Sequence, residues 1–437
     1  MRSYPVILRG FLTTLFAFCL LVNVAGGATA HASPVVAEVV GAGQNQLSVA
    51  LAQPVGNSGN ATKLQGYLAS NLKLVPFVKL VNAAGIPGGG AVGPDGKVGD
   101  FKPYLMAGVD RLVTAYWVAD NRVEIRTYST ADGKLLFGFP YNLGGGGDAV
   151  YDVADKFCGD FLEATIGSGA FFRSTLAFVK SSGPQQRDIW ATKANGRHLR
   201  QLSHIKGQAL SPTWSPDGRY VLFSHIDYRS HGLGVWDAAT NSVRRVRFPG
   251  NTVIGPSYFP DGRVAVSLTD GRNPSIFMLD HSFNKVRKLD ESYGIDVSPS
   301  IDASGTKMVF TSSRMGGPQI FLKDLRTGAV NRISAAGNYN TDPSISPDGT
   351  SVAFARRMAG GHRIFVRDLV TGQERQISHG PGSDEEPAFA PDSYFVAFMS
   401  TRNGKRQVFL TTRYGGQATA LPTGPGDAAF PSWGAAR

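Results

Sequence analysis

The stretch SPTWSPDGRYVLFS at residues 211–224 sets a pattern that returns along the C-terminal two-thirds of the chain. Related segments are centred on six prolines that are spaced 43 or 44 residues apart: Pro212, Pro256, Pro299, Pro343, Pro387 and Pro431. Self-similarity at a fixed period of this length indicates a repeat architecture, in which each repeat is one supersecondary unit.

Each repeat predicts four short antiparallel strands. A strand such as PTW leads into S-P-D-G, where proline fixes φ and Asp-Gly suits a tight turn. A second strand alternates around buried aromatic residues, as at 220–223, and a third (IFVRD, 364–368) and fourth (ERQIS, 374–378) follow. Four such strands in about 44 residues are typical of a propeller blade. The β-branched and aromatic alternation argues against a helical solenoid.

The two ends of the repeat array predict how the propeller closes. The last segment, FPSW at 430–433, has no further strands after it, whereas residues 174–203 supply three strands of a unit that lacks its first. Pairing the C-terminal strand with this opening unit removes two exposed sheet edges. We therefore expect an all-β, six-bladed propeller over residues 168–437, closed by the C-terminal strand.

The N-terminus has the features of a secretory signal peptide over residues 1–32. Arg2 and Arg9 precede an apolar run at 10–24, and Ala30 and Ala32 place small residues where a signal peptidase cleaves. We expect cleavage after Ala32, export without a membrane span, and no lipid anchor.

Residues 33–167 lack the repeat and predict a smaller α+β domain with a mixed sheet. Helical spacing occurs at 62–74 and around Cys158, and strand-like alternation occurs at 47–52, 77–81, 111–118, 122–128 and 134–139. Cys158 is the only cysteine left after cleavage, so no internal disulfide is possible. It is predicted to be a buried structural thiol, because no basic cluster surrounds it. The stretch 167–169 is the expected linker.

The formal charge of +11 comes from basic residues scattered along predicted strands, without the aromatic-interleaved patch of a nucleic-acid site. We therefore expect no nucleic acid among the ligands. Acidic partners or the anionic cell envelope fit this charge better.

The sequence contains no pattern that predicts catalysis, a metal or a cofactor. The segment 88–93 matches G-x-G-x-x-G, but Pro87 and Pro94 flank it, so it predicts a loop rather than a phosphate site. No G-x-S-x-G or H-E-x-x-H pattern occurs. His225 and His231 are expected at the surface. The aspartates that recur in the repeats are expected to bond local backbone N–H groups: Asp217, Asp261, Asp348, Asp237, Asp280, Asp324 and Asp368.

The residues near the start of each proline strand vary from repeat to repeat. Variation on a repeated scaffold is how a propeller forms a specific binding surface, although solvated loop residues remain the alternative for any single position. The predicted partner-binding residues at the propeller mouth are Gln208, Thr252, Val253, Asp296, Val297, Thr341, Asp342, Glu385, Glu386 and Asp427.

The order of signal peptide, α+β domain, bridge GSGAFF (167–172) and six propeller repeats ending in F-P-S-W resembles the TolB family, the periplasmic component of the Tol–Pal system. This resemblance implies a monomeric, non-enzymatic scaffold for outer-membrane integrity and constriction during division. It also implies that the propeller face binds the lipoprotein Pal, with the mouth residues before Pro256 and Pro299 as the leading candidates. The mature N-terminus (33–46) would bind TolA through Glu38, Val39, Val40 and Gly41.

Two other classes of function stay open from the residues alone. A propeller enzyme would use channel carboxylates with a divalent cation, and the absence of a unique His/Asp/Glu cluster speaks against it. A glycan-binding module of the envelope is the other alternative.

Overall fold

The computed structural model describes residues 46–89, 92–183, 185–228, 230–250, 252–269 and 271–435. The predicted signal peptide, its cleavage residues Ala30 and Ala32, and the predicted TolA segment at Glu38, Val39, Val40 and Gly41 lie outside the described residues.

The N-terminal region contains one mixed five-stranded sheet in the order β2-β1-β3-β4-β5. Strand β1 is parallel to β2 and β3, while β3, β4 and β5 are antiparallel. The bounds are β1 Leu47–Leu51, β2 Val78–Val81, β3 Arg111–Ala119, β4 Arg122–Ser129 and β5 Leu135–Asn142. The mixed sheet is the arrangement that the sequence predicts for this region.

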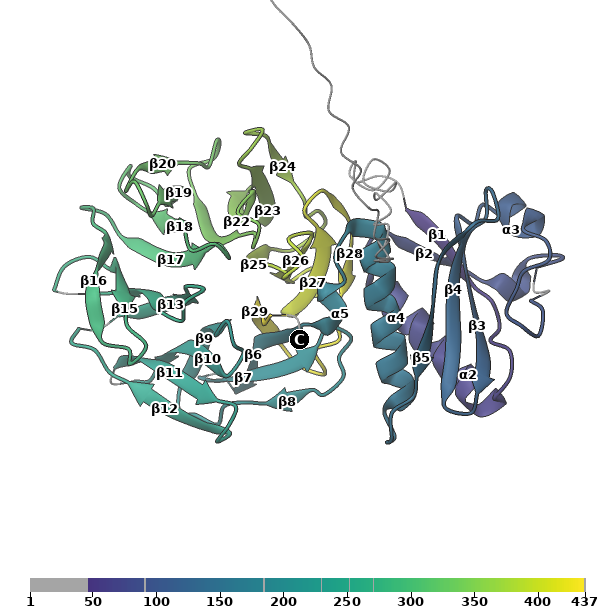
Figure 1. The fold of residues 1–437 in the computed structure, drawn as a ribbon. Coiled ribbons are helices and arrows are strands. Elements are labelled where there is room, and N and C mark those ends of the chain that lie inside the picture. Colours follow the sequence, from purple (N-terminus) through teal and green to yellow (C-terminus); the bar gives the residue numbers. More distant parts are fainter. Residues whose placement is uncertain are drawn as a thin grey trace, which may run out of the picture. The chain divides into compact units, whose positions relative to one another are not determined.

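Two long helices, α2 (Ser58–Leu74) and α4 (Ala149–Ile166), pack on one face of this sheet (Figure 1). In α4, Val150, Val153, Phe157 and Phe161 recur at helical spacing and are buried, as is Cys158. Burial raises the pKa of the Cys158 thiol, so the expectation of a structural thiol is confirmed. The helix ends at Gly167, whose φ of 80° permits a left-handed cap. Shorter elements are the 3₁₀ helix Ala83–Gly85, α3 Lys102–Met106 and α5 Ala170–Arg173.

The remaining strands form antiparallel sheets set around a common centre (Figure 1). An eight-stranded sheet comprises β6 Thr175–Gly183, β7 Gln186–Lys193, β8 Arg200–Gln201, β9 Gln208–Trp214, β10 Tyr220–Ile226, β11 His231–Asp237, β12 Ser242–Val246 and β29 Ala428–Trp433. Its two halves are joined through a single residue pair, Arg187 with Gln208.

Four four-stranded sheets complete the region. The first consists of β13 Val253–Tyr258, β14 Val264–Leu268, β15 Ser275–Leu279 and β16 Lys285–Asp290, and the second of β17 Asp296–Ile301, β18 Lys307–Ser312, β19 Gln319–Asp324 and β20 Val330–Arg332. The third consists of β21 Asn340–Ile345, β22 Ser351–Met358, β23 Gly361–Asp368 and β24 Glu374–Gln376. The fourth consists of β25 Asp384–Phe389, β26 Phe395–Ser400, β27 Gln407–Thr412 and β28 Gly415–Ala420. Strand β29, at the end of the chain, pairs with β6, which lies about 250 residues earlier.

Every innermost strand (β9, β13, β17, β21, β25 and β29) carries a β-bulge at its proline. The register of each strand against its neighbour shifts by one residue there, as between Val297 and Ser300 of β17. The residue directly before the proline has a positive φ of 50° to 57° in all six strands: Ser211, Gly255, Ser298, Asp342, Glu386 and Phe430. Because proline has no N–H to donate to the ladder, a bulge accommodates it.

The aspartates of the turns bond the local backbone, as predicted. Asp217, Asp261 and Asp348 each accept a hydrogen bond from the N–H two residues later, at 2.9 to 3.0 Å. Asp237, Asp280, Asp324 and Asp368 make the same contact at 2.9 Å in the turn after the third strand. Their repetition therefore has a structural cause.

Candidate functional site

A central cavity of about 530 Å³ is lined by the bulged residues of all six innermost strands together with their prolines. The positive φ that the bulge imposes on each residue before a proline places these side chains at the cavity wall. The wall thus combines two serines, one glycine, one aromatic residue and two acids: Ser211, Ser298, Gly255, Phe430, Asp342 and Glu386.

The two acids of the wall lie on neighbouring sheets and both have raised pKa values. Burial is the main cause for Asp342, and the charge of Glu385 adds to it. Burial also raises the pKa of Glu386 to about 8, with a further contribution from the charge of Asp342. The Phe430 N–H donates to Glu386 Oε2 at 2.6 Å and opposes this rise. The cavity therefore holds two acidic groups whose pKa values lie above their ordinary values.

The residues three positions before the prolines behave differently, because their side chains are buried within the sheets. They are Ala209, Val253, Asp296, Asn340, Asp384 and Ala428, with exposed fractions of 0 to 1%. The prediction that Val253 and Asp296 are accessible at the propeller mouth is therefore wrong. The bulge puts the position before the proline on the cavity wall and leaves the position three before it inside the sheet.

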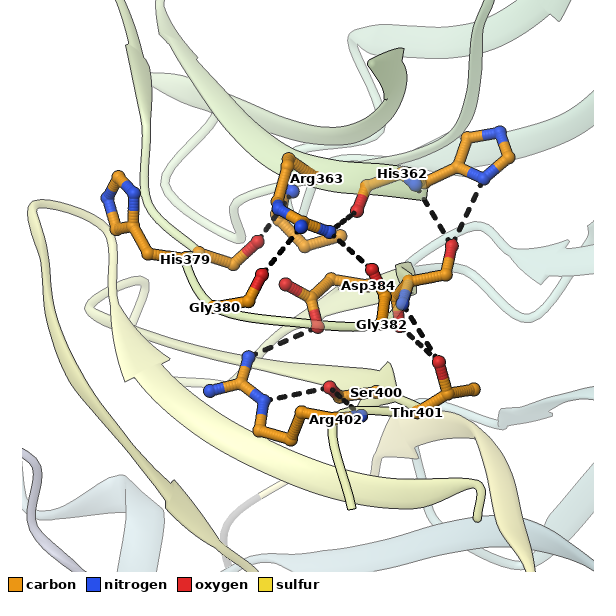
Figure 2. Close-up of polar contacts among 12 residues, drawn as sticks. His362, Arg363, His379, Gly380, Gly382, Asp384, Ser400, Thr401 and Arg402 are labelled. Carbon is orange, nitrogen blue, oxygen red and sulfur yellow. Dashed lines mark hydrogen bonds and ion pairs between the residues drawn. The ribbon is translucent and has the colours of Figure 1, made fainter. Parts of the chain in front are cut away.

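The buried Asp384 is paired with Arg402, which lies in the turn after β26, as Figure 2 shows. Arg402 Nη2 donates to Asp384 Oδ1 at 3.1 Å, and Nε donates to Ser400 Oγ at 2.8 Å. The guanidinium lies over Phe409, with 4.5 Å between its central carbon and the ring centroid. The charge of Asp384 is thus paired within the sheet rather than offered to a partner.

The sheet of β17–β20 repeats this arrangement. Arg314 Nη2 donates to Asp296 Oδ1 at 3.1 Å, and Nε donates to Ser312 Oγ at 2.8 Å. The Arg314 guanidinium lies over Phe321 at 4.9 Å from the ring centroid. Asp296 is therefore part of a structural ion pair.

The other predicted mouth residues are partly exposed and stay candidates for partner contact. These residues, here called the rim, are Gln208, Thr252, Val297, Thr341, Glu385 and Asp427. Glu385 accepts a hydrogen bond from Ser383 Oγ at 2.7 Å, and its Oε1 lies 3.5 Å from His362 Nδ1. These two contacts fix the carboxylate beside the start of β25.

The loop before β25 is fixed by Arg363, whose guanidinium contacts two backbone carbonyls (Figure 2). Arg363 Nη1 donates to Gly382 O at 2.7 Å, and Nη2 donates to Gly380 O at 2.6 Å. Glu385 lies just after this loop, so hydrogen bonds within the chain hold the rim beside it.

The family described as "TolB beta propeller domain" matches residues 162–437. The chain belongs to the TolB family. The "Tol-Pal system protein TolB" of Nitratidesulfovibrio vulgaris is 53% identical to it over 70% of this chain and 71% of the relative. A "Protein TolB homolog" of Chlorobium chlorochromatii is 30% identical over 43% of this chain and 42% of the relative.

The crystal structure of TolB from Acinetobacter baumannii has a TM-score of 0.77 and covers 90% of this chain and 97% of that one, at 21% identity. That likeness concerns the fold. Together with the family match it confirms a TolB-type β-propeller preceded by a smaller α/β region.

Sequence reasoning missed four members of the cavity wall: Ser211, Gly255, Ser298 and Phe430. Each of them lies directly before a repeat proline. The prediction included the residue at this position in the repeats of Pro343 and Pro387, namely Asp342 and Glu386, but not in the other repeats. Aligning all repeats on their prolines would have found them.

The histidine prediction is wrong for His225. Its side chain is 9% exposed, its Nε2 lies 2.9 Å from Lys206 O, and burial lowers its pKa. His231 is partly exposed at the start of β11.

The described residues contain no group of three or more His, Cys, Asp or Glu side chains placed to hold a metal ion. None of their helices has the length and apolar character needed to cross a bilayer. Of the glycine-rich segment 88–93, the residues that the structure describes lie in turns and in an isolated β-bridge, and the next helix is α3.

Proposed function

We propose that this protein is a periplasmic, non-catalytic protein-binding scaffold of the Tol–Pal system that supports outer-membrane integrity and constriction during division. The observation that carries the proposal is the 53% identity of this chain to a protein named for that system, over 71% of that protein's length. A rim around a cavity lined by variable residues suits a binding role. No cofactor or metal is needed for it.

The proposed organisation follows the sequence prediction. Residues 1–32 form a signal peptide, 33–167 the α+β domain and 168–437 the propeller. Counting the eight-stranded sheet as two blades makes six blades with the four other sheets. The pairing of β29 with β6 supports closure of the ring by the C-terminal strand.

We assign the propeller rim to the lipoprotein Pal and the mature N-terminal segment around Glu38, Val39, Val40 and Gly41 to TolA. The rim candidates retained are those with accessible side chains, above all Glu385, Thr341 and Val297, together with the wall acids Asp342 and Glu386. Support for Glu385 is that it is partly exposed and fixed by Ser383.

Binding of purified Pal to the mature chain, measured by biolayer interferometry, tests this proposal. Glu385→Lys reverses a rim charge without removing a buried group, and we expect affinity for Pal to fall about three- to tenfold. Asp120→Lys makes the same charge change at an exposed turn of the N-terminal domain and should leave affinity unchanged. If the unaltered chain fails to bind Pal at micromolar concentration, the scaffold assignment is wrong.

A further inference from the structure

A groove of about 290 Å³ lies between the sheet of β9–β12 and the sheet of β13–β16, and Pro216, Tyr258 and Pro260 line both this groove and the central cavity. Tyr220, Tyr258 and Phe283 supply aromatic walls, and Arg244 and His281 stand at its edge. Tyr220 is the first residue of β10 and Tyr258 is the last residue of the innermost strand β13. The groove is therefore built from fixed positions of the repeat.

The same two repeat positions are aromatic at one other junction between sheets. There, Phe395 is the first residue of β26 and Trp433 is the last residue of β29. Both pairs are separated by 175 residues, which is the spacing from Pro212 to Pro387. At the remaining junctions these positions hold at most one aromatic residue: Thr175 with Trp214, Val264 with Ile301, Lys307 with Ile345, and Ser351 with Phe389.

The second aromatic pair already encloses an aromatic side chain. Phe171 of α5 is fully buried, with its ring centroid 4.9 Å from that of Phe395 and 5.5 Å from that of Trp433. An aromatic pair at these two repeat positions thus packs around a third aromatic side chain, that of Phe171. The Tyr220–Tyr258 pair presents the equivalent walls around an open groove.

Charge adds a second requirement for the occupant. The Arg244 guanidinium lies over Phe283, at 4.9 Å from the ring centroid, and makes no ion pair with any described residue. Asp261, in contrast, is already paired with Arg263 at 2.7 Å. A carboxylate entering the groove would meet the Arg244 guanidinium on the aromatic surface, with Asp217 and Asp261 also in the lining.

We infer that the Tyr220–Tyr258 groove is a second docking site, which receives an aromatic side chain next to an acidic residue of a partner protein. The chain's own segment at 33–45 contains no aromatic residue and does not meet this requirement. The groove lies at the last residue of β13, whereas Thr341 and Glu385 of the rim lie near the starts of β21 and β25, so the inference extends the proposed function and does not depend on it.

The test uses a synthetic peptide, acetyl-Gly-Ser-Gly-Glu-Phe-Ala-amide, added to the isotope-labelled mature chain and followed by NMR chemical shifts. We expect shifts at the groove residues, with binding weakened at least about tenfold when the peptide's phenylalanine is replaced by alanine. Replacing its glutamate by glutamine should weaken binding about two- to fivefold. N-acetyl-phenylalaninamide should bind more weakly than the peptide, because it lacks the carboxylate and the flanking backbone.

Protein variants separate the groove from general effects. Tyr220→Ala should abolish the shifts, whereas Lys307→Ala, at the equivalent strand position of another junction, should retain them. Tyr258→Phe should also retain them, because it keeps the ring, and the buried Tyr258 hydroxyl has no hydrogen-bond partner among the described residues.

Three results would each overturn the inference. They are the absence of shifts in the groove at millimolar peptide, equal binding of the alanine peptide, and equal binding of the free amide, which would make the site one for small aromatic molecules. A self-association of the chain that Tyr220→Ala abolishes would assign the groove to a second copy instead.

Discussion

The residue three positions before each repeat proline and the residue directly before it lie on the same short strand, yet they have opposite environments. The first is buried inside a sheet, and in two sheets it is an aspartate paired with an arginine that stacks on phenylalanine. The second has a positive φ and lines the central cavity. A single bulge at the proline therefore separates a buried position from a position on the cavity wall in each innermost strand. A charged side chain at the first position affects the stability of the sheet, and one at the second faces the cavity.

The largest effect should come from removing one strand that carries both positions. Deleting residues 428–437 removes β29 and leaves the edge of β6 unpaired. It also removes Trp433 from the side of Phe171. We expect the free energy of unfolding to fall by about 5 kcal/mol or more, which is the scale of a whole domain's stability. Urea denaturation followed by circular dichroism measures it. An equally cooperative and stable deletion variant would refute closure through β29.

Breaking a buried ion pair should cause the next largest loss in the free energy of unfolding. Arg402→Ala leaves Asp384, whose side chain has no exposed surface, without its cation. We expect a loss of about 3–5 kcal/mol, because an uncompensated buried charge remains. Arg326→Ala is the matched control, since its pair with Asp324 is at the surface and 75% of the arginine side chain is exposed. That change should cost less than about 0.5 kcal/mol. Similar losses for the two variants would contradict the distinction between the buried and open positions.

Glu386, on the cavity wall, should make the free energy of unfolding depend on pH. Its folded pKa of about 8 lies above the ordinary value of 4.5, so the folded state keeps the proton of Glu386 where the unfolded state has lost it. The stability contributed by this group is complete below pH 4.5 and is lost as pH rises to about 8. Since the residue is partly exposed, we expect a loss of about 1–2 kcal/mol over that range.

Glu386→Gln should remove most of this pH dependence in thermal unfolding measured between pH 5 and 8. Glu291→Gln, at a side chain that is 74% exposed, should preserve it. A stability that rises with pH over this interval in the unaltered chain, and falls in the Gln variant, would show that the carboxylate is ionised in the fold.

The sequence allowed the prediction of the propeller, because the proline period, the Asp-Gly turns and the unmatched end strands are local patterns. It did not allow the environment of each mouth residue to be predicted. Asp296 and Asp384 pair with arginines 18 residues later in the chain, in the turn after the adjacent strand, and the bulge that buries them depends on hydrogen bonding between strands. The groove containing Phe171 was likewise hidden, because α5 and β29 meet only in the folded chain.

The smallest expected changes in stability come from substitutions at the positive-φ residue of the bulge, directly before the repeat proline. Gly255 has a φ of +56°, and an added Cβ would lie 3.1 Å from the Ser298 Cα. Gly255→Ala should therefore destabilise the protein by about 1–2 kcal/mol. Ser298→Gly is the converse change at a φ of +54°, where relief of the left-handed conformation and the added freedom of the unfolded chain oppose each other. We expect a change below about 0.5 kcal/mol in urea denaturation. A large loss on Ser298→Gly would mean that the serine side chain, rather than the bulged backbone, maintains the cavity wall at that strand.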